Sequence, residues 1–594
     1  MEKKLTSSDD EIRKYFGWED YTVFGGMLLV SAGIGVYHGF SFKKKKNDVD
    51  SVENGSAKEF LTASGKMSTL PVALSMLASF LSSITLMGQP AEVYLYGPGL
   101  WLIGIAFLPI LPVLIFLCVP FFRNLNVTSA YEYFGQRFGR PFQCFASVSF
   151  TLQILLFLAL VLYAPALALH QVTGINTLLV VVIMYFVCIF YTTIGGMKAV
   201  AWTDTFQIIV LYTAVIAVVI KGTLDLGGFE IVWKRNLQNS RGILFDFNID
   251  PTERYTFWSS FVGGAFLHLS VFGANQMQIQ RYLTVPTMKS VKNMLYINGV
   301  GWTIVTILTA YSGMLIYAKY YDCDPISNKD IKTPDQLFPF YVMDVLGEYK
   351  GFPGLFVAGI FSAGLSTVST GVNSLAAIWF SELEGTKFKK NLDPKKAGLV
   401  VKGMALFFGL SSFVLVFLVP YMGNLVPVTI SLSSFFSGSF FGIFVLGNFV
   451  PFANSWGAFS GLTCGIGFVG WLAIGTQISL ENGYKINDVL PTSVENCYSN
   501  NITSSIFSEK NDREPAFALY RLSFLWYSLL ALVITVTVGV IVSGLTNLRY
   551  RSLFKTNSYQ EVSKIEKVDG GKPKNLGIYV AKGRELDVKL LTLK

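Results

Sequence analysis

Charged residues are scarce in this 594-residue chain: they make up 14% of it, against 52% hydrophobic and 15% aromatic residues. Soluble globular proteins carry roughly 25% charged residues, so the composition excludes an ordinary soluble fold. It predicts an all-α polytopic membrane protein. The formal net charge of +9 comes from basic residues in loops, where they set membrane orientation. No nucleic-acid partner is needed to explain it.

Histidine and cysteine are also rare. The three histidines are His38, His170 and His268, and no paired acids share a plausible site with them, so we expect no enzyme. The six cysteines include no Cys-x-x-Cys pair, which argues against a zinc site or a disulfide scaffold. The first 20 residues lack the short basic segment and cleavage site of a signal peptide, so the first apolar segment is expected to insert itself.

Apolar segments of about 20 residues, the length that crosses a bilayer, recur along the chain. We expect thirteen transmembrane helices, at about 21–40, 70–96, 99–119, 142–169, 177–194, 205–220, 258–273, 294–317, 354–380, 399–419, 426–450, 458–474 and 518–545. Lys and Arg cluster in alternate short connections, which places that side in the cytoplasm. Residues 1–20 are then extracellular, residues 21–545 form the membrane domain, and residues 546–594 form a cytoplasmic tail.

Two features fall on the external side of this map. The sequon that begins at Asn501 lies in a long external connection, where glycosylation can occur. Cys323 and Cys497 are external as well, so a disulfide between them is one of the arrangements that the map allows.

The second apolar segment, from Thr69 to Trp101, is interrupted by Gly88-Gln89-Pro90 and contains several serine and threonine residues. A helix broken inside a bilayer must direct its free backbone groups at protein, a cavity or an ion, and secondary transporters build ion sites in this way. The alternative is a proline-kinked helix whose hydroxyl groups bond to its own carbonyls.

The seventh apolar segment also looks interrupted, by Gly263-Gly264 and Gly273. It comes five segments after the second, and irregular segments at matching places indicate an inverted repeat. The repeats would cover about 70–220 and 258–450, with further helices before and after. The alternative for the glycine pair is close helix packing.

Four stretches resemble signature sequences of the sodium/solute symporter family. They are GQPAEVYLYG (Gly88–Gly97), GGMKAVAWTDTFQ (Gly195–Gln207), GANQMQIQRYL (Gly273–Leu283) and FSAGLSTVSTGVNSLA (Phe361–Ala376). The resemblance implies a LeuT-type five-plus-five inverted repeat with broken second and seventh helices. It also implies sodium-coupled uptake across a plasma membrane.

The resemblance also implies a sodium site. In the family, positions matching Ala78 and Leu81 supply carbonyl oxygens, and positions matching Ala363, Ser366 and Thr367 supply one carbonyl and two hydroxyl oxygens. Such oxygens suit sodium, a hard cation. Alternatively, the two hydroxyl groups bond to their own helix. One sodium site is indicated in this way, and we favour two ions per cycle because concentrating an anion against an inside-negative membrane needs more than one cation.

Three charged residues lie in or beside the apolar segments. The family places Asp204 on the inner exit route of sodium, and an acid at that depth is a functional candidate by default; the alternative is a helix N-cap. Arg281 and Glu92 are expected near the membrane interfaces, with structural roles.

The expected solute site lies between the two broken helices and includes Thr85, Gln89, His268 and Phe272. Thr85 matches the threonine of the monocarboxylate branch, and the lining is too apolar for a sugar. A small carboxylate could be met by Thr85, by helix amide ends and by His268, although His268 could instead be a packed histidine bonded across helices. The expected function is sodium-coupled import of a small organic anion such as lactate or nicotinate. Biotin- or pantothenate-type vitamins and iodide are alternative solutes, and a sodium-conducting channel is the alternative class.

Overall fold

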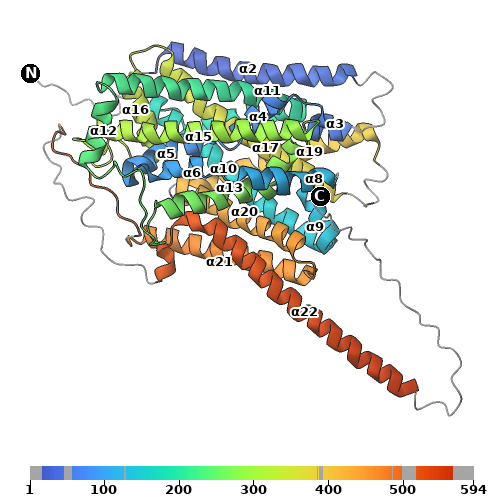
Figure 1. Cartoon of the computed structure of the whole chain (residues 1–594). Coiled ribbons are helices and arrows are strands. Elements are labelled where there is room, and N and C mark those ends of the chain that lie inside the picture. The colour runs from blue at the N-terminus through green and yellow to red at the C-terminus, as the bar shows by residue number, and fades with distance from the viewer. Residues whose placement is uncertain are drawn as a thin grey trace, which may run out of the picture. The chain divides into compact units, whose positions relative to one another are not determined.

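The chain folds almost entirely into helices (Figure 1). This computed structural model describes residues 16–45, 56–125, 127, 129–383, 386, 392–423, 425–484, 486–497 and 517–565, and every regular element in them is helical. The chain divides into two compact units, residues 1–543 and 544–594. The sequon at Asn501 lies outside the described residues.

Nine helices in the described part of the chain are long and apolar enough to cross a membrane, or ten if the bent pair α4–α5 forms one span. The nine are α2 (Trp18–Lys45), α10 (Arg140–Thr173), α11 (Thr177–Asp225), α15 (Met288–Lys319), α17 (Phe352–Glu382), α19 (Pro394–Leu415), α20 (Leu425–Phe449), α21 (Ser455–Glu481) and α22 (Tyr527–Ile565). These helices support the prediction of a polytopic membrane protein. The predicted count of thirteen separate transmembrane helices is not confirmed.

The difference arises at four of the expected segments. The expected fifth and sixth segments are two helices joined across a kink at the non-helical Gly196, and they are counted together as one 49-residue element, α11. The third is divided into short pieces, η3 (Pro98–Trp101), α6 (Leu102–Ile105), α7 (Leu111–Val113), the π-helical η4 (Leu114–Cys118) and α8 (Val119–Asn124). The seventh is divided into the π-helical η5 (Trp258–Gly263), α13 (Gly264–Ala274) and α14 (Gln276–Tyr282).

The second segment is broken, but not where Gly88-Gln89-Pro90 predicts. Helix α4 (Thr69–Ala78) ends before Ser79, and α5 (Ser83–Tyr96) begins after Ser82 and continues through Pro90; the two helices meet at 53°. The Ser82 hydroxyl accepts a hydrogen bond from the Thr85 amide at 3.3 Å. This side-chain cap satisfies one of the free amides at the new helix start.

The seventh segment is likewise broken at a capping residue. Asn275 has an extended backbone, and its side-chain oxygen accepts from the Met277 amide at 2.9 Å. Gly263 and Gly264 lie inside helical turns, where a Cβ at Gly263 would come 2.7 Å from the Leu525 carbonyl oxygen. The glycine pair therefore serves close packing, which is the alternative given above.

Helix α17 is at the centre of the first unit, since 94% of its apolar stretch is buried. It contacts α2, α4, α5, α10, α11, α14 and α19. The other described elements are shorter: α3 (Ser56–Thr62), η2 (Ala63–Gly65), α9 (Ala130–Phe138), α12 (Phe229–Gln238), η6 (Pro334–Gln336), α16 (Leu337–Leu346), η7 (Val416–Tyr421), η8 (Ala518–Arg521) and η9 (Phe524–Trp526). Both broken pairs therefore pack against one buried helix that is rich in small polar residues.

Candidate functional site

The break between α4 and α5 meets the middle of α17. Thr367 Oγ1 lies 3.0 Å from the carbonyl oxygen of Ser79 and 3.0 Å from that of Ala363, so its hydroxyl can donate a hydrogen bond to either oxygen. The Ser79 hydroxyl lies 3.0 Å from Thr370 Oγ1 and 3.4 Å from Ser366 Oγ. All of these side chains are buried. Hydroxyl and carbonyl oxygens of two segments far apart in sequence therefore converge at one buried point.

The residues expected to hold sodium lie at this point. Ala78 and Leu81 flank the break, Ala363, Ser366 and Thr367 lie on the facing part of α17, and all five are buried. Within the described part of the chain, no hydrogen bond is made to the carbonyl oxygens of Ala78 or Leu81. Because the helix is broken there, those oxygens are left without amide partners. This set of neutral oxygens fits a hard monovalent cation.

A buried ion pair lies beside these oxygens. Arg281 Nη2, on α14, is 3.3 Å from Asp204 Oδ2, on α11, and neither side chain is exposed. The Ser75 hydroxyl donates to the same carboxylate oxygen at 2.6 Å, whereas Asp204 Oδ1 is buried without a hydrogen-bond partner among the described residues. Arg281 Nη2 also donates to Thr370 Oγ1 at 2.6 Å and to Ser79 Oγ. The pair thus connects α14, the second half of the seventh segment, to the break and to α17.

Arg281 is fully buried among the helices, and its depth relative to the membrane interfaces stays a prediction. Asp204 is not a helix N-cap, because α11 is helical on both sides of it. A buried acid needs a nearby cation, so the basic residue in the motif Gly273–Leu283 was the signal that could have identified its partner. The hydroxyl groups of Ser75, Ser79 and Thr370 were not assigned to the site from sequence.

Glu92 is also buried inside the protein. Its carboxylate accepts from Arg254 Nε at 2.9 Å, from Arg254 Nη2 at 2.8 Å and from the Tyr255 hydroxyl at 2.6 Å. Arg254 is also among the residues that line a cavity of about 410 Å³. None of the four expected solute residues lines this cavity, so it is separate from the expected solute site.

The expected solute residues lie on α5 and α13. Gln89 Oε1 accepts from the Thr309 hydroxyl at 2.6 Å, and the Thr85 hydroxyl lies 3.3 Å from Ser82 Oγ. The Phe272 ring is 5.4 Å from the ring of Phe80, which lies in the break. The broken pairs are therefore in contact through these aromatic rings.

His268 is packed and hydrogen-bonded across helices. Its Nε2 lies 3.0 Å from the carbonyl oxygen of Ile103, to which it donates a hydrogen bond. The ring packs against Phe107, Phe272 and Trp302. This contact matches the packed-histidine alternative, and a role in solute binding stays a prediction.

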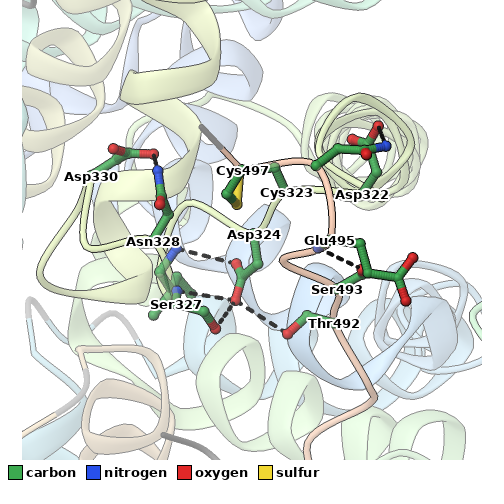
Figure 2. The surroundings of a disulfide bond; sticks show 12 residues. Asp322, Cys323, Asp324, Ser327, Asn328, Asp330, Thr492, Ser493, Glu495 and Cys497 are labelled. Carbon is green, nitrogen blue, oxygen red and sulfur yellow. Dashed lines mark hydrogen bonds between the residues drawn. A yellow bond between two sulfur atoms is a disulfide. The ribbon is translucent and has the colours of Figure 1, made fainter. Parts of the chain in front are cut away.

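A disulfide joins Cys323 to Cys497 (Figure 2). Beside it, the buried Asp324 carboxylate accepts from the hydroxyls of Tyr94 at 2.7 Å and Ser327 at 2.6 Å. Its backbone amide donates to Ser493 at 2.9 Å. The segment around Cys497 is thus fixed to the connection that follows α15 and to the end of α5.

Known proteins identify the class to which this arrangement belongs. A Na⁺-coupled sialic acid symporter, solved in a substrate-bound outward-open state, superposes with a TM-score of 0.70 at 23% identity, over 89% of this chain and 98% of that one. The two proteins share a fold. Residues 60–465 match the model of the sodium:solute symporter family, and the chain belongs to that family.

Curated relatives make the assignment more specific. The chain is 37% identical to sodium-coupled monocarboxylate transporter 2 of Mus musculus over 90% of its length and 85% of the relative. It is 36% identical to sodium-coupled monocarboxylate transporter 1 of Homo sapiens, over 90% and 88%. A Drosophila melanogaster protein named as a sodium-dependent multivitamin transporter is 34% identical, over 89% and 86%. This chain is therefore a multi-pass membrane symporter that couples solute movement to Na⁺, and it is not an enzyme.

Proposed function

We propose that the solute is a small organic anion, a monocarboxylate such as lactate or nicotinate, imported across the plasma membrane with Na⁺. The observation that carries this proposal is the 36–37% identity to monocarboxylate transporters over 90% of the chain. The polar side chains of Thr85 and Gln89 on α5, together with the aromatic contacts of Phe272 on α13, support it, because a monocarboxylate offers one charged group and a small apolar body. Vitamins of the biotin and pantothenate type are the second candidate, on the strength of the multivitamin relative.

The proposed sodium site comprises Ala78, Leu81, Ala363, Ser366 and Thr367. The meeting of Thr367 with the broken helix supports it, because that contact joins one element of each expected repeat. Sodium bound there would stabilise the arrangement that completes the solute site, and the solute would strengthen sodium binding by the same factor. Asp204, paired with Arg281, is proposed to lie on the route by which sodium leaves.

The proposed orientation places the N-terminus outside the cell and the C-terminal tail in the cytoplasm. The disulfide between Cys323 and Cys497 supports an external position for the connections that contain it, because disulfides persist in oxidising compartments. Glycosylation of Asn501 is proposed on the same side.

The test is tracer uptake by expressing cells, with and without sodium. The panel contains lactate, nicotinate, biotin, pantothenate, iodide and glucose. Saturable, sodium-dependent uptake of lactate or nicotinate is expected. Uptake of biotin and pantothenate without either monocarboxylate would replace the first candidate by the second.

A further inference from the structure

The connection between α12 and η5 contains an exposed row of apolar side chains. Residues 245–250 run without helix, turn or bend and alternate apolar with polar residues, as Phe-Asp-Phe-Asn-Ile-Asp. Because alternate residues of an extended chain point to opposite sides, Phe245, Phe247 and Ile249 share one side. These three residues, the apolar row, are 49%, 61% and 80% exposed.

Aromatic contacts fix the apolar row beside the starts of two membrane segments. The Phe245 ring lies 5.4 Å from the ring of Trp101, in η3, and the Phe247 ring lies 5.1 Å from that of Phe257, directly before η5. The Phe257 amide also donates to the Asp246 carbonyl oxygen at 2.6 Å. Elements η3 and η5 begin the third and seventh of the expected apolar segments. The apolar row therefore lies at the level at which those segments begin.

The backbone of this stretch excludes a position in the hydrocarbon. Among the described residues, the three amides of the apolar row have no hydrogen-bond acceptor. The amides between them bond only to neighbouring side chains, Asn248 to Asp246 at 3.0 Å and Asp250 to Asn248 at 3.1 Å. Free amides are costly in hydrocarbon, whereas the headgroup region supplies water and lipid oxygens as acceptors.

The opposite side of the stretch is polar and faces water. Asp246 lines the cavity of about 410 Å³ described above, and Asn248 and Asp250 are exposed. The Asp250 carboxylate accepts from the Thr252 amide at 2.8 Å. The stretch is therefore amphipathic, with an apolar row on one side and two acids on the other.

An exposed apolar patch marks contact with a protein or with a membrane, and two observations favour the membrane. The apolar row is continuous with the starts of two membrane segments, where Trp258 of η5 is also 41% exposed. Aromatic residues are enriched at membrane–water interfaces, and the row together with its ring contacts is mostly aromatic.

We propose that the apolar row is a lipid-binding surface that lies in the membrane–water interface, with its side chains among the acyl chains and Asp246, Asn248 and Asp250 in water. In the proposed orientation this is the interface of the outer leaflet. The inference goes beyond the proposed function, because it requires neither the solute nor the sodium site.

Lipid bound there would also position a loop that contacts the broken second segment. The hydrogen bond between Asp246 and Phe257 closes a loop that contains Arg254 and Tyr255. Both of these side chains donate to the carboxylate of Glu92, on α5. The apolar row thereby fixes the depth of a loop that is hydrogen-bonded to α5.

The first experiment measures depth by spin labelling of the full chain in phosphatidylcholine nanodiscs. The exposed native Cys144 and Cys464 are replaced by serine, and a cysteine is introduced at Phe247 or at its neighbour Asn248. The collision rate of the label with oxygen, which concentrates in lipid, is divided by that with a nickel chelate, which stays in water. The ratio is expected to be several-fold higher at Phe247 than at Asn248.

Equal ratios at the two positions, or a ratio at Phe247 typical of water, would overturn the lipid-binding surface. Low collision rates with both reagents at Phe247 would show that protein covers the row, which would overturn it as well. Because the measurement uses neither sodium nor solute, failure of monocarboxylate uptake would leave this inference standing.

The second experiment tests whether the row acts as one surface. The label is placed at Ile249, and a second substitution is made two residues away. Phe247→Trp is expected to keep the ratio, whereas Phe247→Asp is expected to lower it several-fold, because a charged residue moves out of lipid towards water. Asn248→Asp, which adds the same charge on the polar side, is the matched control and is expected to keep the ratio. An unchanged ratio in Phe247→Asp, or an equal fall in Asn248→Asp, would refute the proposal.

Discussion

Replacing Thr367 by alanine is expected to weaken sodium dependence while leaving the fold intact. Thr367 Oγ1 is fully buried and lies 3.0 Å from the carbonyl oxygens of both Ser79 and Ala363, so it is one of the oxygens proposed to surround sodium. Loss of one polar partner from a charged group costs about 1.5 kcal/mol, which is roughly tenfold in binding. The half-saturating sodium concentration for solute uptake should therefore rise about tenfold.

The assay measures tracer uptake against sodium concentration at matched surface levels. Thr367→Ser keeps the hydroxyl and is expected to keep the parent half-saturation. Thr306→Ala is the matched control, because Thr306 is also a buried threonine but bonds within its own helix, to the Trp302 carbonyl at 2.9 Å. If Thr367→Ala showed the parent half-saturating sodium, the sodium assignment would be refuted.

Three further predictions concern the ion pair, the disulfide and the charge moved. Arg281→Gln is expected to lower the amount of protein at the cell surface, because a buried charge left without its partner costs about 3–5 kcal/mol. Adding Asp204→Asn should restore much of the surface level. Purely additive losses in the double variant would contradict the ion pair. Cys323→Ser, Cys497→Ser and the double variant should all lower the melting temperature by the same amount, which corresponds to a loss of about 2–5 kcal/mol in the free energy of unfolding. Unequal losses among the three variants would show that the thiols act separately. Under voltage clamp, the anionic solute should evoke inward current in sodium, since each net charge moved inward gains about 2.3 kcal/mol per 100 mV; uptake without current would refute two-ion coupling and leave symport intact.

The positions of the two helix breaks depended on tertiary contacts. The proline at Pro90 suggested a break at Gly88-Gln89-Pro90, because an interior proline removes one helical hydrogen bond and its ring crowds a carbonyl of the preceding turn, but α5 continues through it. The actual break at Ser79–Ser82 is stabilised partly from outside its own segment, where Thr367 of α17 meets the exposed Ser79 carbonyl. A carbonyl freed in a membrane is tolerable only where such a partner exists. Here the partner, Thr367, is 288 residues away in sequence.

The role of glycine was misjudged for a related reason. Gly263-Gly264 and Gly88 looked like helix breakers, because glycine lowers helix propensity. In the structure these glycines lie within helices and admit neighbouring groups, the Leu525 backbone in one case and Asp335 with Val426 in the other. Propensity is a property of one residue, whereas close approach depends on the helix that packs against it.

The sequence by itself determined the membrane class, the family and the residue types of the site, since hydropathy and motif spacing are local properties of the chain. The tertiary structure alone decided which polar groups meet. Asp204 and Arg281 are 77 residues apart and lie on different helices; a buried acid calls for a nearby cation, but neither segment specifies which basic residue it meets. Their pairing arises because a charge buried away from water is stable only beside an opposite charge, and the packing of α4, α11, α14 and α17 is what brings those charges together.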